Sequence, residues 1–88
     1  MRIKDGFVVR EIGGKFFAVP VGELSQSFHA MISLNGTAHE MWGLLQTDTS
    51  EKAMAEAIAK KYEADEAEVL SDVQTFVDSL RKADLIIE

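Results

Sequence analysis

Two adjacent glycines near the N-terminus place the tightest constraint on how this chain can fold. Gly13 and Gly14 separate the runs 7–12 and 15–19, which are rich in β-branched and aromatic residues. Such runs favour strands, and two glycines accept the positive φ angles of a two-residue hairpin turn. The sequence therefore predicts an antiparallel hairpin. Its register pairs Ile12 with Lys15, Arg10 with Phe17 and Val8 with Val19.

A third strand is predicted after the hairpin. Pro20 ends the second strand, because proline cannot donate a hydrogen bond to a neighbouring strand. Residues 21–30 have the composition of a loop, and the strand pattern resumes over residues 30–34. Asn35 follows as an expected N-cap, whose side chain would accept from the first amides of a helix that ends near residue 46.

Two further helices are predicted from their caps and their apolar spacing. Asp48, Thr49 or Ser50 would cap the second, and Asp65 would cap the third, which should extend from about Glu66 to Ala83. An apolar tail over residues 85–87 should pack back on the core. We therefore expect one α+β domain spanning residues 1–88, with a three-stranded antiparallel sheet followed by three helices in a winged-helix-like arrangement.

Composition and charge indicate the cellular compartment and limit the classes of binding partner. The chain has no cysteine, no apolar run long enough to span a membrane and no signal-peptide pattern at its N-terminus, so we expect a cytoplasmic protein without membrane contact. The net charge is −6, and residues 21–88 hold thirteen acidic against five basic side chains. This acidic half repels phosphate backbones and could attract a basic surface, or it could simply confer solubility.

The residues that would perform chemistry are scarce. No serine lies in a nucleophile-elbow motif, no glycine-rich phosphate loop occurs, and His29 and His39 are the only histidines. We therefore expect no catalytic residue, no cofactor site and no metal site. Two alternatives stay open: a winged-helix protein that binds nucleic acid, and a metal-dependent enzyme with its ion near His29 or His39. The acidic third helix argues against the first.

Several segments in order resemble the PqqD-like family of small peptide-binding domains, also called RiPP recognition elements. The resemblance extends from about Phe7 to Ile87. It is carried by the segments Val19-Pro20-Val21-Gly22-Glu23, Ile32-Ser33-Leu34-Asn35-Gly36-Thr37-Ala38, Met41-Trp42-Gly43-Leu44-Leu45, Tyr62, Asp72-Val73 and Phe76-Val77-Asp78-Ser79-Leu80. No single motif is specific, but their order and spacing together are.

The resemblance implies a non-catalytic chaperone for precursor peptides that are made on the ribosome and then modified. A leader segment of the precursor would bind as an added strand beside the third strand, and the domain would present it to a modifying enzyme, often a radical S-adenosylmethionine enzyme. An unpaired strand edge offers main-chain groups for this kind of binding. A homodimer formed by edge pairing or hairpin exchange is compatible with this function. The expected peptide-binding residues are Met31, Ile32, Ser33, Leu34, Leu70, Val73, Val77 and Arg81.

One departure from the family pattern concerns the pathway. The member dedicated to pyrroloquinoline quinone typically has an aromatic-Pro-Glu segment just before its Leu-Asn. Here Pro20 and Glu23 lie well upstream of Leu34-Asn35, with residues 21–30 between. The sequence therefore predicts a PqqD-like protein without specifying its precursor.

Overall fold

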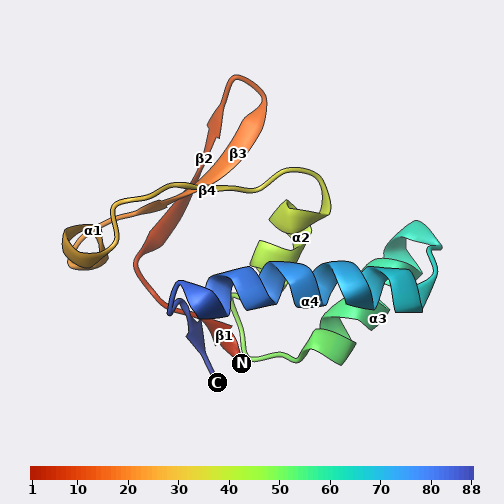
Figure 1. Cartoon of the computed structure of the whole chain (residues 1–88). Helices are drawn as coiled ribbons and strands as arrows, with labels where there is room; N and C mark the ends of the chain where they lie inside the picture. Colours follow the sequence, from red (N-terminus) through yellow and green to blue (C-terminus); the bar gives the residue numbers. More distant parts are fainter.

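A computed structural model describes all 88 residues as a mixed α+β fold. Strands β2 (Phe7–Ile12), β3 (Lys15–Pro20) and β4 (Ile32–Ser33) form an antiparallel sheet in the order β2-β3-β4. Helices α2 (Thr37–Leu44), α3 (Glu51–Tyr62) and α4 (Glu66–Lys82) follow (Figure 1). The predicted order of three strands and three helices is confirmed, and so is the predicted hairpin register.

Two short elements were not predicted. A one-turn helix, α1 (Leu24–Ser27), lies within the expected loop over 21–30, so the structure has four helices rather than three. Local bonds hold this turn, since the Phe28 amide donates to the Leu24 carbonyl at 2.8 Å, and no apolar periodicity marks so short an element. A second sheet pairs β1 (Arg2–Ile3) with β5 (Ile86–Ile87), which brings the two termini together (Figure 1).

Helix starts follow the predicted caps at two of three places. The Ser50 side chain accepts from the Ala53 amide, and the Asp65 side chain accepts from the Ala67 and Glu68 amides. The prediction of Asn35 as the cap of α2 was wrong, because the helix begins later and Gly36 is its cap residue. Gly36 has φ 50° and ψ −124°, a conformation that favours glycine and turns the chain sharply from β4 into α2.

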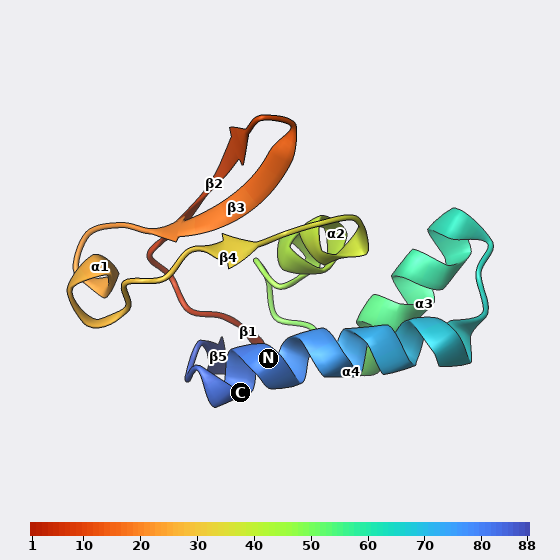
Figure 2. The ribbon, with the colours of Figure 1, turned by 45° about the horizontal axis from the view of Figure 1, so that its top comes forward.

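One face of the hairpin packs on α2. The Phe7 ring meets Trp42 edge-on with centroids 5.1 Å apart, and the Phe16 ring stacks on His39 at 3.9 Å. Helices α3 and α4 pack against each other beneath α2 (Figure 2), and fifteen buried apolar residues form one continuous core. The tip of the hairpin projects beyond this core (Figure 1). Strand β4 lies between the hairpin and the helices (Figure 2).

Replacing the two glycines of α2 by alanine should change the stability of the fold in opposite directions: Gly36 is the cap residue and Gly43 lies within the helix. Gly36→Ala should destabilise the fold by about 1–3 kcal/mol, because alanine is strained at this positive φ. Gly43→Ala should stabilise it by about 0.4–1 kcal/mol, since Gly43 is helical and a Cβ there meets nothing within 4 Å. Urea denaturation of both variants checks the pair. A neutral or stabilising effect of Gly36→Ala would contradict the assigned geometry of the junction.

Candidate functional site

The outer edge of β4 is an unpaired row of backbone groups. The Leu34 amide donates to the Phe16 carbonyl at 2.9 Å, and Ser33 lies opposite Phe17. In an antiparallel ladder, successive residues point their backbone groups alternately toward and away from the neighbouring strand. The N–H and C=O of Ser33 therefore point away from β3. The C-terminal strand β5 pairs with β1, so the chain's own tail leaves this edge open.

A hollow of about 340 Å³ lies next to the end of β4, between the start of α2 and the middle of α4. Asn35, the residue after Leu34, belongs to its lining and connects it to the strand. Figure 2 shows that α4 runs in the direction opposite to β4 on this side of the molecule. The lining residues are Asn35, Thr37, Ala38, Met41, Asp72, Thr75, Phe76 and Ser79.

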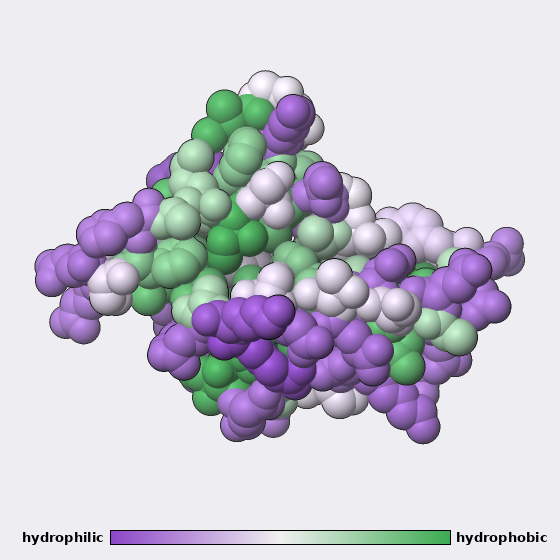
Figure 3. Space-filling view, in the orientation of Figure 1, coloured by the Kyte–Doolittle hydropathy of each residue, from purple (hydrophilic) through white to green (hydrophobic).

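The surface around β4 is apolar on the sheet and polar on the helix. In the view of Figure 3, hydrophobic surface covers the hairpin and continues down toward α4, whose outward face is mostly hydrophilic. Met31, which immediately precedes β4, is 55% exposed. An extended segment placed here would contact an apolar surface on one side and a polar helix flank on the other.

The four site residues predicted on the third strand differ in accessibility. Met31 and Ser33 are exposed, and Ile32 is half-buried. Leu34 is fully buried in the core. A partner at this edge would therefore meet the backbone of β4 and the side chain of Met31, while Leu34 supports the strand from beneath.

The site residues predicted on the third helix do not line the hollow beside β4. Val73 and Val77 are fully buried, so they form the core-facing line of α4. Leu70 and Arg81 are eleven positions apart, which places them about 20° from each other around the helix axis. Arg81 binds Glu51 at the start of α3, at 2.8 Å, so this flank faces α3 and not the hollow.

The opposite flank of α4 lines the hollow instead. Asp72, Phe76 and Ser79 follow one another at four- and three-residue spacing along this flank. They were not among the expected site residues, because the spacing of Phe76 from Val73 and Leu80 is also that of a core-facing stripe. The available signal was the position of Phe76 between two polar residues, Asp72 and Ser79, at helical spacing.

Arg81 already has three carboxylate partners within the chain. Its guanidinium lies 2.8 Å from Glu88, 2.8 Å from Glu51 and 3.0 Å from Asp78. These hydrogen bonds, led by those to Glu88 and Glu51, raise the pKa of Arg81 above its usual value. Arg81 therefore links α3, α4 and the C-terminal residue Glu88, a structural role that differs from the predicted contact with the leader.

A second cluster holds α2 against α3. One carboxylate oxygen of Glu40 accepts hydrogen bonds from the Lys61 ammonium, at 2.7 Å, and from the Tyr62 hydroxyl. The Lys61 hydrogen bond is the main cause that holds the pKa of Glu40 below its ordinary value, and the Tyr62 hydrogen bond adds to it. The same contacts raise the pKa values of Lys61 and Tyr62. Helices α2 and α4, which line the hollow, are thus each linked to α3 by an ion pair.

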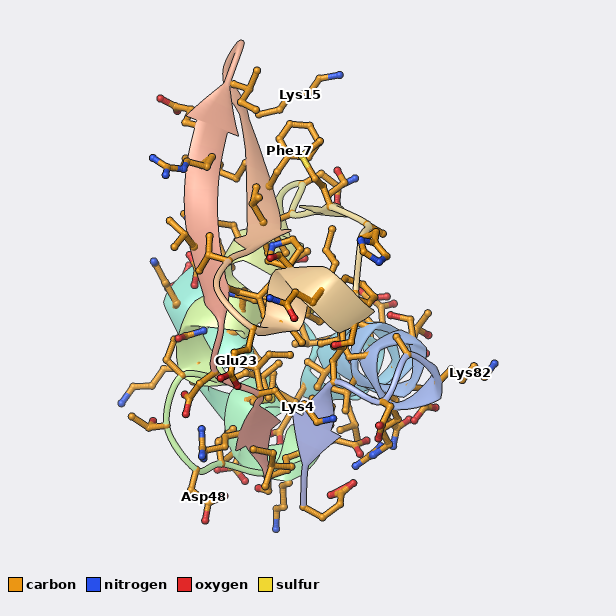
Figure 4. All side chains as sticks on the ribbon, turned by 90° about the vertical axis from the view of Figure 1, so that its left-hand side faces the viewer. Lys4, Lys15, Phe17, Glu23, Asp48 and Lys82 are labelled. Carbon is orange, nitrogen blue, oxygen red and sulfur yellow. The ribbon has the colours of Figure 1, made fainter.

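Another hollow, of about 440 Å³, lies between the hairpin tip and the start of α2. His39 lines it and stacks on Phe16, while Lys15 and Phe17 project near the hairpin tip (Figure 4). No three histidine or acidic side chains come together in a group that could hold a metal ion. None of the helices has the length and apolar character needed to span a membrane.

Comparison with known proteins identifies related sequences and a related fold. The sequence profile of the family described as Coenzyme PQQ synthesis protein D (PqqD) matches residues 10–86. No curated protein matches the chain. A solved structure described as "TbiB1 in Complex with the TbiA(beta) Leader Peptide" is similar, with a TM-score of 0.71 and 21% sequence identity. The match covers 97% of this chain and 93% of the other, and at this identity it shows a shared fold.

The role of Arg81 is testable through stability. Arg81→Ala should lower the thermal unfolding midpoint, because three carboxylates would lose their shared cation and α3 would lose a link to α4. Lys82→Ala is the matched control, since Lys82 extends away from the rest of the chain at the end of α4 (Figure 4) and has no ion pair. Equal midpoints for the two variants would show that the Arg81 cluster adds no stability.

The Glu40 cluster predicts a dependence of stability on pH. A carboxylate whose pKa is lowered by folding stabilises the protein above its unfolded value, here 4.5, and loses that contribution as pH falls through the folded pKa. The unfolding midpoint of the natural chain should therefore fall on acidification from pH 6 to pH 3. Glu40→Gln should show a smaller fall than the control Glu11→Gln, whose carboxylate has no ion pair. Equally steep profiles for the two variants would exclude this contribution.

Proposed function

Because the chain belongs to the PqqD family, we propose that it is a non-catalytic chaperone that binds the leader segment of a ribosomally made precursor peptide. The leader adds as a strand to the free edge of β4 and lies beside α4. The observation that carries the proposal is the unpaired backbone edge of β4, which lies next to the hollow between α2 and α4. The similar fold of TbiB1, which is described in complex with a leader peptide, supports it.

In strand addition, main-chain hydrogen bonds supply affinity and side-chain contacts supply selectivity. The outward N–H and C=O of Ser33 supply main-chain hydrogen bonds that any extended segment can make. Side chains of the guest alternate between two faces, so every second one points toward α4 and the core. The hollow beside Asn35 can then distinguish one leader from another.

The predicted site residues take different parts in this proposal. Met31, Ile32 and the backbone of Ser33 contact the leader directly, and Leu34, Val73 and Val77 form the packed layer beneath it. Asp72, Phe76 and Ser79 replace Leu70 and Arg81 as the contacting residues of α4, because they line the hollow.

The bound leader positions its precursor for another enzyme. In the proposal this partner is a modifying enzyme in the cytoplasm, which for such domains is often a radical S-adenosylmethionine enzyme, and the domain itself holds no cofactor. The sheet has a second outer strand, β2, at the far side from β4. A homodimer that pairs β2 with its copy would leave the leader edge free. Binding to duplex DNA is disfavoured by the exposed carboxylates of α4, at Glu66, Glu68, Asp72 and Asp78.

A proline at the free edge tests the proposal. Ser33→Pro removes the outward N–H and places a ring in the path of the guest, while the hydrogen bonds of Ile32 and Leu34 to β3 remain. The probe is a set of twelve-residue peptides selected on the natural chain from an mRNA-displayed random library. Affinity, measured by fluorescence anisotropy, should fall about tenfold or more in Ser33→Pro, which corresponds to the loss of a main-chain hydrogen bond together with a steric conflict.

The matched control is Ser33→Ala, which keeps the N–H and should bind as the natural chain does. Amide spectra of both variants establish that the sheet is intact. Selected peptides that bind Ser33→Pro and Ser33→Ala equally well would contradict strand addition at β4.

A further inference from the structure

Asp72 is an unpaired charge inside the proposed groove. It lines the hollow between α2 and α4, and its carboxylate has no ion pair and no hydrogen bond within the chain. No lysine, arginine or histidine lines this hollow. The neighbouring aspartates in sequence, Asp65 and Asp78, have partners, since Asp65 caps α4 and Asp78 binds Arg81. The hollow therefore carries a net negative charge that nothing in the chain neutralises.

The hydroxyl groups beside Asp72 already donate within α4, which leaves their lone pairs for a guest. The Thr75 hydroxyl donates to the Ser71 carbonyl at 3.0 Å, and the Ser79 hydroxyl donates to the Phe76 carbonyl at 2.6 Å. Each hydroxyl has one proton, so the oxygen lone pairs are what remains for a ligand. With these bonds in place, Asp72, Thr75 and Ser79 all present acceptors to the hollow, which favours a guest that supplies donors.

The apolar part of the hollow suits the stem of a long side chain. Ala38, Met41 and Phe76 line it together with the acceptors. Lysine and arginine bury an aliphatic stem and place their donors at its end, and arginine offers five N–H groups. Asn35 and Thr37 complete the lining and can donate or accept.

Strand geometry fixes which guest residue reaches the hollow. In an antiparallel pair, side chains directly opposite each other lie on the same face of the sheet. The guest residue opposite Leu34 therefore points inward, as Leu34 does, and Asn35, the residue after Leu34, lines the hollow. Guest residues on either side of it point to the outer face.

We infer that the leader recognised by this chain carries an arginine or lysine at the position opposite Leu34, where Asp72, Thr75 and Ser79 receive its cationic end. Asp72 is the residue that determines this preference. The inference rests on the proposed function, because it uses strand addition at β4 to bring the guest side chain to the hollow. It defines the class of leader as an extended segment with a basic residue at one fixed register.

The test is a comparison of peptide preferences. The same mRNA-displayed random twelve-residue library is selected in parallel on the natural chain, on Asp72→Lys and on Glu11→Lys. Glu11→Lys makes the same change of charge on the exposed hairpin, away from the hollow. The natural chain and Glu11→Lys should enrich arginine or lysine at one position, and Asp72→Lys should lose this preference or replace it with aspartate or glutamate.

Single peptides then give the size of the effect. Replacing the enriched basic residue by glutamine should weaken binding to the natural chain roughly two- to tenfold, with a smaller difference in 0.5 M salt, as expected for a partly exposed ion pair. The same replacement should leave binding to Asp72→Lys unchanged or stronger. Unfolding curves for each variant establish that the changes in affinity are measured on folded protein.

The outcomes separate this inference from the proposed function. Peptides that depend on the β4 edge, as shown by Ser33→Pro, but have no basic preference would overturn the inference alone. An identical consensus for the natural chain and Asp72→Lys would do the same. Peptides that bind equally well to Ser33→Pro and Ser33→Ala would instead overturn strand addition itself.

Discussion

The alternation of backbone groups along β4 is the constraint on which the site depends. Because Ile32 and Leu34 pair with β3, the intervening Ser33 must present its N–H and C=O to the outside. The C-terminal strand β5 pairs with β1, so the outer backbone groups of β4 have no partner strand. A two-residue edge strand is too short to attract indiscriminate partners strongly, so a guest needs further contacts, and the flank of α4 supplies them.

The frame around this edge was largely predictable from sequence, because its signals are local. Gly13 and Gly14 set the hairpin register, and Ser50 and Asp65 mark the starts of two helices. Local signals also explain the failures. Asn35 resembles a cap by type, but the turn out of β4 needs the positive φ of Gly36, and the helix starts after it. The single turn α1 and the two-residue pairing of β1 with β5 have no periodicity to detect.

The helix side of the site was not predictable in the same way. Periodicity shows that α4 has an apolar stripe, but not which flank of the stripe meets α3 and which meets α2. Tertiary contacts decide this. Arg81 binds Glu51 of α3, so the flank of α4 that holds Arg81 and Leu70 faces α3, and Phe76 and Asp72 line the hollow. Arg81 was expected among the peptide-binding residues, whereas the lining of the hollow favours Asp72 as the residue that meets the guest.

Hydrogen exchange at the Ser33 amide tests the central claim most directly. In the free protein this amide points to solvent, while the amides of Ile32 and Leu34 are bonded within the sheet. Saturation with a selected peptide should slow exchange at Ser33 strongly, because its N–H becomes part of a new ladder. An unchanged exchange rate at Ser33 in the peptide-saturated protein would contradict the account.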